Sequence, residues 1–220
     1  MSGIWRKVRS AWSVSTLCTL FAVAACDTFP LTTTDFEQDL AQSPQVQRSK
    51  SEAWVAPPDI QLVLERSFGP VSEQRILLPN RTAVRGDNFL LLRAREGTLA
   101  TIGRFEPLEL LGATGDTPDP FEDFDSLLLE TRDEPMGTLS WAVWTNNANL
   151  NCVLAFRRLD ASSRVVPEGA GVMDMMLRNC VHGTVEQALA PALEVNVGYA
   201  AAGPEGDLPR MLSPLAAPQP

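Results

Sequence analysis

Histidine is almost absent from this chain, since His182 is the only one among its 220 residues. A single imidazole limits the hydrolytic mechanisms that use histidine as a general base, and it leaves no paired histidines to bind a metal. The sequence also has no G-x-S-x-G, no H-E-x-x-H and no glycine-rich phosphate loop. We therefore expect a protein that is not an enzyme, has no catalytic residues and holds no metal or cofactor.

The chain also lacks an apolar run of the roughly 20 residues that span a bilayer. The longest candidate, residues 13–25, is almost wholly uncharged and follows a basic segment without acids, residues 1–12. A short apolar stretch behind a basic one is typical of a secretory signal peptide. It ends in Val23-Ala24-Ala25-Cys26, which resembles the lipobox of bacterial lipoproteins.

The lipobox resemblance implies that residues 1–25 are removed and that Cys26 is lipidated as the first residue of the mature protein. The lipid would anchor the protein to a membrane at the periplasmic face of the cell envelope. Asp27 resembles an inner-membrane retention signal, but that rule transfers poorly between bacteria, so the choice of inner or outer membrane stays open. The alternative is an ordinary secreted protein whose small residues serve normal cleavage.

Basic residues are scarce once the leader is gone. From residue 26 onward 15 basic side chains stand against 27 acidic ones, a balance of −12. Such a charge argues against nucleic acid as a partner and against peripheral binding to anionic lipid.

The chain has only four cysteines, and two of them belong to the leader region: Cys18 would leave with the signal and Cys26 would carry the lipid. Cys152 and Cys180 remain. An even pair in an oxidising compartment predicts a disulfide, and two buried free thiols are the alternative.

Composition divides the whole chain into the leader, residues 1–25, and three further parts. Residues 26–53 are polar and predict a flexible tether behind the lipidated cysteine, residues 54–200 a single domain, and residues 201–220 a disordered proline-rich tail. Short apolar runs with period-two alternation predict the strands, which we place at 60–68, 73–78, 89–95, 98–105, 138–145, 152–159 and 171–181.

Closely spaced short strands favour an antiparallel sheet, and the chain after Thr184 predicts a short helix that Pro191 ends. The expected fold class is therefore α+β, mainly antiparallel sheet with a short C-terminal helix. Residues 112–136 read as a solvated acidic loop, with the three leucines 127–129 tucked into the core beside it.

Two tryptophans stand on one expected strand. Trp141 shares a face with Leu139 and Val143, which indicates burial in a core. Trp144 points to the opposite face and is the better candidate for stacking on a glucan ring, although core packing is the more common role of such a residue.

The stretch QLVLERSFGPVSEQRILLPNRTAVRGDNFLLLR resembles the opening of BcsN-type cellulose biosynthesis proteins, which are accessory products of bacterial cellulose operons. The likeness spans about residues 55–195, although Phe156 replaces an expected tryptophan and residues 98–136 match poorly. The positions that carry it are Gln74, Thr82, Gly86, Asn88, Cys152, Ala155, Phe156, Arg158, Leu177, Arg178, Cys180 and Thr184.

The resemblance implies a non-enzymatic envelope lipoprotein that acts as an accessory or scaffold in cellulose biosynthesis or export. Its expected partners are the membrane, through the lipid anchor, and other cellulose synthase subunits or the nascent glucan. A glucan-binding lipoprotein is the rival interpretation, and a periplasmic polysaccharide hydrolase is a weaker one.

Overall fold

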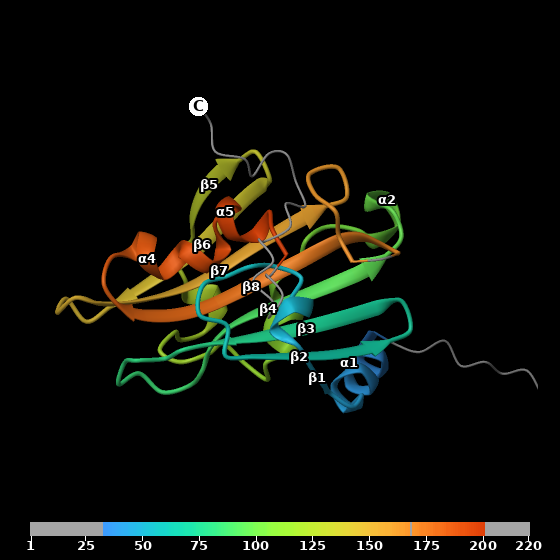
Figure 1. Cartoon of the computed structure of the whole chain (residues 1–220). Coiled ribbons are helices and arrows are strands. Elements are labelled where there is room, and N and C mark those ends of the chain that lie inside the picture. The colour runs from blue at the N-terminus through green and yellow to red at the C-terminus, as the bar shows by residue number, and fades with distance from the viewer. Residues whose placement is uncertain (1–32, 168, 201–220) are drawn as a thin grey trace, which may run out of the picture. The chain divides into compact units, whose positions relative to one another are not determined.

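Eight strands form one antiparallel sheet in the computed structural model, which describes residues 33–167 and 169–200 (Figure 1). The strands are β1 (Val46–Arg48), β2 (Leu62–Phe68), β3 (Val71–Leu78), β4 (Asn88–Glu96), β5 (Glu130–Glu134), β6 (Gly137–Thr145), β7 (Leu150–Asp160) and β8 (Ala170–His182).

The sheet consists of two four-stranded meanders that lie side by side. Their order is β1-β2-β3-β4-β8-β7-β6-β5, so β4 and β8 meet in the middle of the sheet. The chain between β4 and β5 must therefore cross from the centre of the sheet to its far edge. The described residues from Glu37 onward belong to one compact unit that contains this sheet, and the preceding unit is described only at residues 33–36.

The helices are short and lie mostly in connections. They are α1 (Thr33–Gln42), η1 (Lys50–Glu52), α2 (Leu99–Ile102), α3 (Pro107–Gly112), η2 (Phe124–Ser126), α4 (Val185–Leu189), η3 (Ala190–Ala192) and α5 (Glu194–Val197). The predicted start of α4 is confirmed, because the Thr184 side chain accepts a hydrogen bond from the Gln187 backbone and the Gln187 side chain accepts one from the Thr184 backbone. Pro191 lies in η3, directly after α4 ends.

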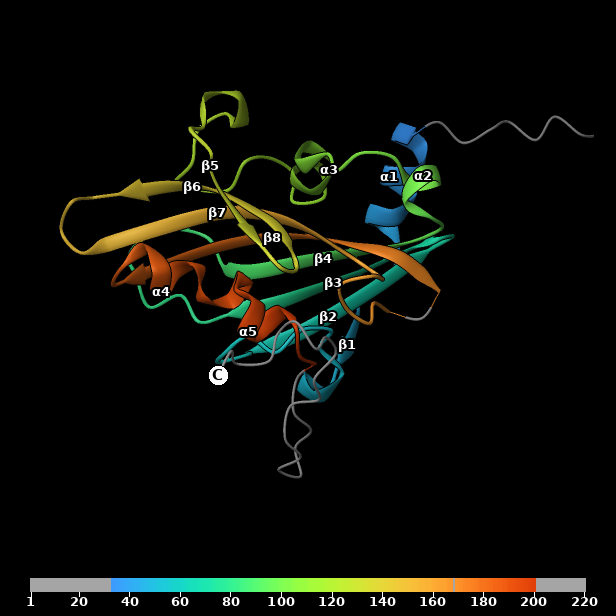
Figure 2. The same cartoon turned by 90° about the horizontal axis from the view of Figure 1, so that it is seen from above.

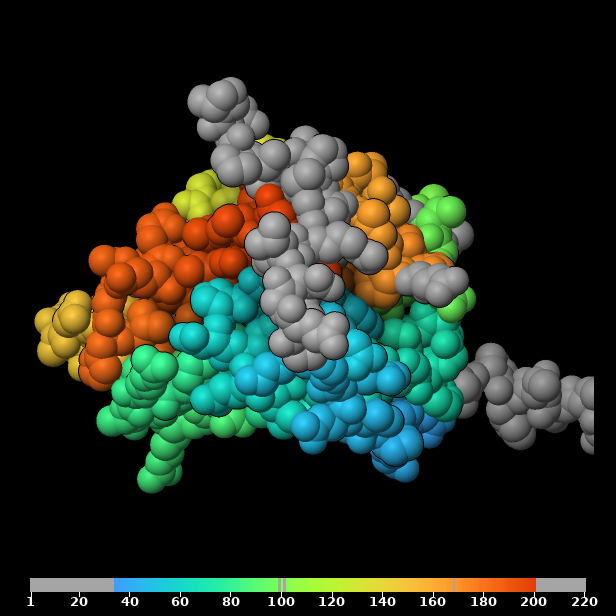
Figure 3. All heavy atoms as spheres, viewed as in Figure 1, coloured from blue at the N-terminus to red at the C-terminus, as the bar shows by residue number. Residues whose placement is uncertain are grey.

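The two faces of the sheet carry separate hydrophobic cores. One core, on what we call the α4 face, includes Leu139, Trp141 and Val153 and packs against α4 and η3. The other core, on the α3 face, includes Leu154 and Phe156 and packs against α3. Figure 2 shows α4 and α5 on one side of the sheet and α3 on the other, and Figure 3 shows the C-terminal helices, in red, at the surface of the α4 face.

The expected fold class is confirmed: the protein is α+β, mainly antiparallel sheet with short C-terminal helices. The alternation on the strand that contains both tryptophans is also confirmed, because Trp141 belongs to the core of the α4 face and Trp144 packs against that of the α3 face.

The strand predicted at residues 98–105 is wrong, because the chain leaves the sheet after β4 and forms α2. Strands β3 and β8 already occupy both edges of β4, so the segment cannot fold back and pair with the strand that it follows. Gly97 turns the chain with φ +122°, and its carbonyl lies so close to Gly171 that a Cβ there would stand 1.9 Å away. Only glycine fits such an approach.

Residues 112–136 contain more regular structure than the sequence predicts. They include η2 and β5, and β5 forms a hairpin with β6 through a two-residue connection. Leu127 packs against the core of the α3 face as expected, but Leu128 is 90% exposed and Leu129 is 41% exposed, so the prediction for these two leucines is wrong.

The predicted flexible tether, residues 26–53, is folded where the structure describes it. Strand β1 pairs with β2, Leu40 of α1 is fully buried and Ala53 belongs to the core of the α4 face. The segment has too few apolar residues to show a period, yet Leu40 and Ala53 are enough to fix it on the sheet. The domain therefore begins well before residue 54.

Other predictions fall outside the described residues. These are the signal peptide, the lipidated Cys26 and the tail at 201–220. No helix within residues 33–167 and 169–200 has the length and apolar character needed to cross a bilayer.

Candidate functional site

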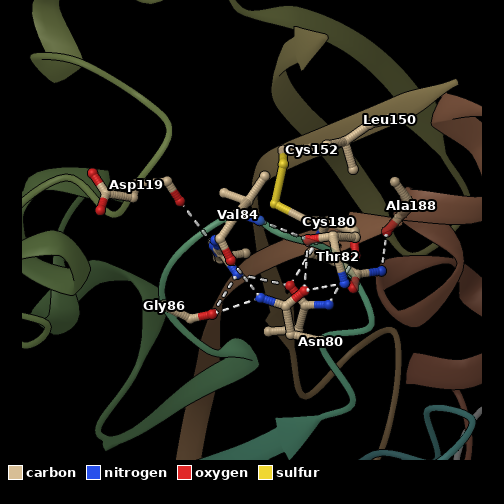
Figure 4. Close-up of a disulfide and its surroundings, with 12 residues drawn as sticks. Asn80, Thr82, Val84, Gly86, Asp119, Leu150, Cys152, Cys180 and Ala188 are labelled. Carbon is tan, nitrogen blue, oxygen red and sulfur yellow. Dashed lines mark hydrogen bonds between the residues drawn. A yellow bond between two sulfur atoms is a disulfide. The ribbon is translucent and has the colours of Figure 1, made fainter. Parts of the chain in front are cut away.

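The predicted disulfide between Cys152 and Cys180 is present and joins the two longest strands. The two residues are direct partners in the register of β7 and β8, and their Cα atoms are 4.0 Å apart. Both side chains are buried in the core of the α3 face. The disulfide therefore connects neighbouring strands in the middle of the sheet (Figure 4).

Asn88 extends the pairing of β4 with β8 through its side chain. Its amide nitrogen donates to the Cys180 carbonyl at 3.0 Å, and its Oδ1 accepts from the Cys180 N–H at 2.8 Å. Because both backbone groups of Cys180 point toward Asn88, they point away from β7. Cys152 and Cys180 thus form a non-hydrogen-bonded pair, the kind that brings side chains closest across antiparallel strands.

Arg178 is the centre of a larger cluster on the same face. Its guanidinium donates to Asn88 Oδ1 at 2.8 Å and to the backbone carbonyls of Gly86, Arg85 and Asp119. Burial lowers the pKa of Arg178, while the nearby charges of Asp119 and Asp87 act in the opposite direction. Arg178 therefore holds two loops against β8.

The loop between β3 and β4 is folded by its own polar side chains. Asn80 donates to the carbonyls of Val84 and Gly86, and its Oδ1 accepts from the backbone and hydroxyl of Thr82. Gly86 has φ +86°, a conformation that glycine adopts without strain. We call Asn80, Thr82, Gly86, Asn88, Arg178 and the disulfide the hub (Figure 4).

Gln74 performs a similar task on the α4 face. Its side-chain oxygen accepts from the backbone N–H of Trp54 at 2.8 Å, and its nitrogen donates to the carbonyl of Glu52 at 3.1 Å. Gln74 is fully buried, so both bonds replace lost contacts with water. This residue fixes the chain before β2 onto the sheet.

A row of opposite charges crosses five neighbouring strands on the α3 face. Its members alternate in sign and are successive partners in the sheet register; they are Arg66, Glu73, Arg93, Asp174 and Arg158. Glu73 contacts Arg66 and Arg93 at 2.5 and 3.0 Å, and Asp174 binds Arg158 through both carboxylate oxygens. We call this set the charge row.

The N-terminal segment closes part of the charge row. Glu37 of α1 contacts Arg93 at 2.9 Å, and the carbonyl of Ala41 accepts from Arg66 at 3.1 Å. This arrangement could not be predicted from the sequence alone. The only signal in the sequence is that charged residues occupy inward positions of otherwise apolar strands. Their partners can be identified only when the strand order is known, because β4 and β8 are far apart in sequence.

The residue proposed for glucan stacking, Trp144, is only half-buried. It lies opposite Cys152 in the register, and the pairing of β5 with β6 begins at Glu130 and Trp141 and runs away from Trp144. The outer edge of β6 beyond Trp141 therefore has no neighbouring strand among the described residues. Trp141, by contrast, is 8% exposed and is stacked under Arg132 at 5.5 Å.

The side chains that could have formed a metal site around His182 are used elsewhere or lie apart. The disulfide uses the cysteines that could have joined His182 at a metal, and His182 itself is exposed. Within residues 33–167 and 169–200, no three side chains of histidine, cysteine, aspartate or glutamate are grouped to hold a metal ion.

An open groove lies between α3 and the segment that follows it. It has a volume of about 420 Å³, with Leu108, Leu111 and Phe124 as apolar lining and three aspartates, 116, 123 and 125, around it. The surrounding stretch, residues 105–131, has eight acidic side chains and no basic one. This segment therefore holds eight of the 27 acidic residues of the chain with no basic residue to balance them.

Three comparisons with known proteins, against family models, curated proteins and solved structures, find no significant match for this chain.

Proposed function

We propose that the protein is a lipid-anchored accessory or scaffold of bacterial cellulose biosynthesis or export that acts by contact and catalyses no reaction. The proposal rests on the resemblance to BcsN-type proteins. In it, Cys26 carries the lipid, the domain faces the periplasm, and the partners are other subunits of the synthase or the nascent glucan.

The observation that carries the proposal is that six of the twelve positions that make the resemblance lie together in the hub: Thr82, Gly86, Asn88, Cys152, Arg178 and Cys180. Asn88 and Arg178 are 90 positions apart in the chain, yet their side chains are bonded at 2.8 Å. Thr82, Gly86 and Cys180 join them in the hub. Residues far apart in sequence that bond to one another are expected when a sequence pattern is inherited together with a fold.

The tasks of these residues also favour a role without catalysis. Arg178 binds carbonyls, Asn88 completes a strand pair, and Arg158 binds the buried Asp174. Catalytic groups contact a substrate in a pocket, whereas these groups are used up by contacts inside the protein. A domain held in this way is suited to presenting a fixed surface.

Glucan binding remains a second candidate because of Trp144. Its ring is half-buried at the edge of β6, and an aromatic face of this kind can stack on the C–H face of a sugar. Trp144→Ala should then weaken retention of the folded protein on amorphous cellulose. Trp141→Ala should also reduce retention, but because the protein loses its fold.

The test is extracellular cellulose, measured by dye binding in a strain that lacks the gene. We expect the deletion to lower cellulose and the intact gene to restore it. Single replacements of Asp or Glu by the amide that leave the protein stably folded should each restore it as well, because no carboxylate is a reacting group.

Two results would contradict the proposal. Unchanged cellulose in the deletion strain would remove the link to cellulose. Loss of cellulose on one carboxylate replacement in a stably folded protein would point to an enzyme, and release of reducing sugar from amorphous cellulose would identify a hydrolase.

A further inference from the structure

The groove beside α3 is built on the core of the α3 face. Leu111 in its wall is 4% exposed, and Phe124 packs edge-on against the buried Phe156 with ring centroids 5.7 Å apart. Leu108, by contrast, is 59% exposed and offers its side chain to solvent at the groove. Because two of its walls belong to the core, the groove is already formed before anything binds.

The rim of the groove carries an unbalanced negative charge. Asp116 accepts a hydrogen bond from the backbone N–H of Thr117 at 2.7 Å, but no basic side chain in the described ranges forms an ion pair with Asp116, Asp123 or Asp125. The buried acids Glu73 and Asp174, by contrast, are each paired with arginine inside the chain. The negative charge at the rim is exposed beside an apolar groove, so cations of a binding partner would complement it.

We propose that this groove docks a basic, apolar segment of a partner protein. A leucine-sized side chain would pack on Leu108 and Phe124, and lysine or arginine side chains beside it would face the aspartates. The chemical identity of the partner follows from charge: an anionic polymer is repelled, and a neutral glucan gains nothing from the field. The inference rests on the proposed function, to which it adds the chemistry of the contacted subunit.

The two features of the groove have different tasks in such a contact. Rim charges mainly speed association and exclude wrong partners, whereas an apolar side chain buried at the centre supplies most of the affinity. Binding should therefore weaken as salt is raised, and it should also depend on Leu108 at high salt, where the rim is screened.

The probe is a short synthetic amphipathic peptide with leucine and arginine on one face, together with the same peptide carrying uncharged citrulline in place of arginine. Binding to the full mature chain is measured by fluorescence anisotropy. We compare a triple variant of the rim, D116N/D123N/D125N, with a control triple, D39N/D87N/E96Q, which removes the same charge from exposed positions outside the groove.

The rim triple should bind the arginine peptide about ten-fold more weakly, as expected for three screened pairs, and the control triple about as well as the original chain. Leu108→Ser should weaken binding at high salt. Circular dichroism confirms that each variant is folded. Equal losses in the two triples, or equal binding of the citrulline peptide, would overturn the proposal.

A cello-oligosaccharide titrated in the same assay tests the other occupant. Binding of the sugar that is lost in the rim triple, with no binding of the arginine peptide, would replace the proposed partner by a glucan. Cellulose output separates this inference from the proposed function: a deletion that lowers cellulose beside a peptide that fails to bind refutes the groove alone. Peptide binding with unchanged cellulose refutes the function instead.

Discussion

Buried arginine side chains bind loops and neighbouring strands to the sheet beside its two hydrophobic cores. Arg178 is 1% exposed and satisfies three backbone carbonyls and Asn88 at once. A planar guanidinium can reach partners in several directions, whereas an ammonium group is one point at the end of its stem. The position therefore needs arginine specifically, and not just a positive charge.

Arg178→Lys should accordingly lower the free energy of unfolding by about 2–3 kcal/mol, because loop carbonyls would be left buried without donors. The same exchange at the exposed Arg81 is the control and should change stability by less than about 0.5 kcal/mol. Urea denaturation measures both. Equal effects at the two positions would mean that the hub contributes little.

Glu73 is the carboxylate that two buried cations share. It is 3% exposed between Arg66 and Arg93, so Glu73→Gln would leave two buried guanidinium groups against one neutral amide. Breaking a buried pair from one side costs about 3–5 kcal/mol. We expect a loss of that order in the free energy of unfolding, again measured in urea.

Glu65→Gln is the matched control for Glu73. Glu65 lies on the adjacent strand and pairs with Arg48, but 20% of its side chain is exposed and 40% of its partner's. An ion pair with that much water contributes about 0–1 kcal/mol. If both replacements destabilise alike, the charge row is not a special feature of the fold.

At the scale of elements, the disulfide acts on a strand pair that is already long. Cys152 and Cys180 enclose a loop with a sequence separation of 28 residues, for which chain entropy gives about 3–4 kcal/mol. Replacing both cysteines by serine should lower the stability by about this amount and leave the fold intact, because Asn88 still binds the backbone of residue 180. Alkylation of both thiols before any reduction, in protein taken from the envelope, would show that the bond does not form there.

The folded N-terminal segment gives a second prediction at this scale. Leu40 of α1 is fully buried, so Leu40→Ala should lower the free energy of unfolding by about 2–4 kcal/mol. Leu128→Ala is the control, since Leu128 is 90% exposed and has little to lose. A Leu40 variant as stable as the Leu128 one would mean that residues 37–53 are a tether after all.

Elements could be predicted from the sequence where one local pattern decided them. The alternation in β6 and β7, the cap at Thr184 and the pairing of Cys152 with Cys180 needed only neighbouring residues or the compartment. The segment after Gly97 could not, because its apolar residues fit a strand, whereas both edges of the preceding strand β4 are already taken by β3 and β8. Leu40 and β1 were missed for the opposite reason: their burial depends on a surface that other strands supply.

The candidate sites follow the same division. Cys152 and Cys180 were identified in advance, while the charge row and the groove appeared only with the strand order, since they combine residues from β2, β3, β4, β7 and β8 or from the crossing segment. Long-range pairing is what a single sequence hides. The charged residues were visible, but their partners were not.

On the scale of the whole molecule, function should depend on where the domain is held. In the proposed arrangement Cys26 anchors the chain, and the folded domain begins near Glu37, so only a short segment separates lipid from domain. A short link keeps the local concentration of the domain high at its partner. A contact that is weak in free solution can then be occupied most of the time. A contact through one open groove would be of this weak kind.

We therefore expect Cys26→Ala to abolish lipidation, and a soluble periplasmic form with a replaced leader to restore cellulose poorly in the deletion strain. Overproducing the soluble form should recover part of the output, because a higher bulk concentration substitutes for the anchor. Palmitate still incorporated by the Cys26 variant would refute the lipid anchor. Full restoration by the soluble form at the normal level would mean that Cys26 is lipidated but that the lipid is not needed for function. The domain would then bind its partner tightly enough without a tether.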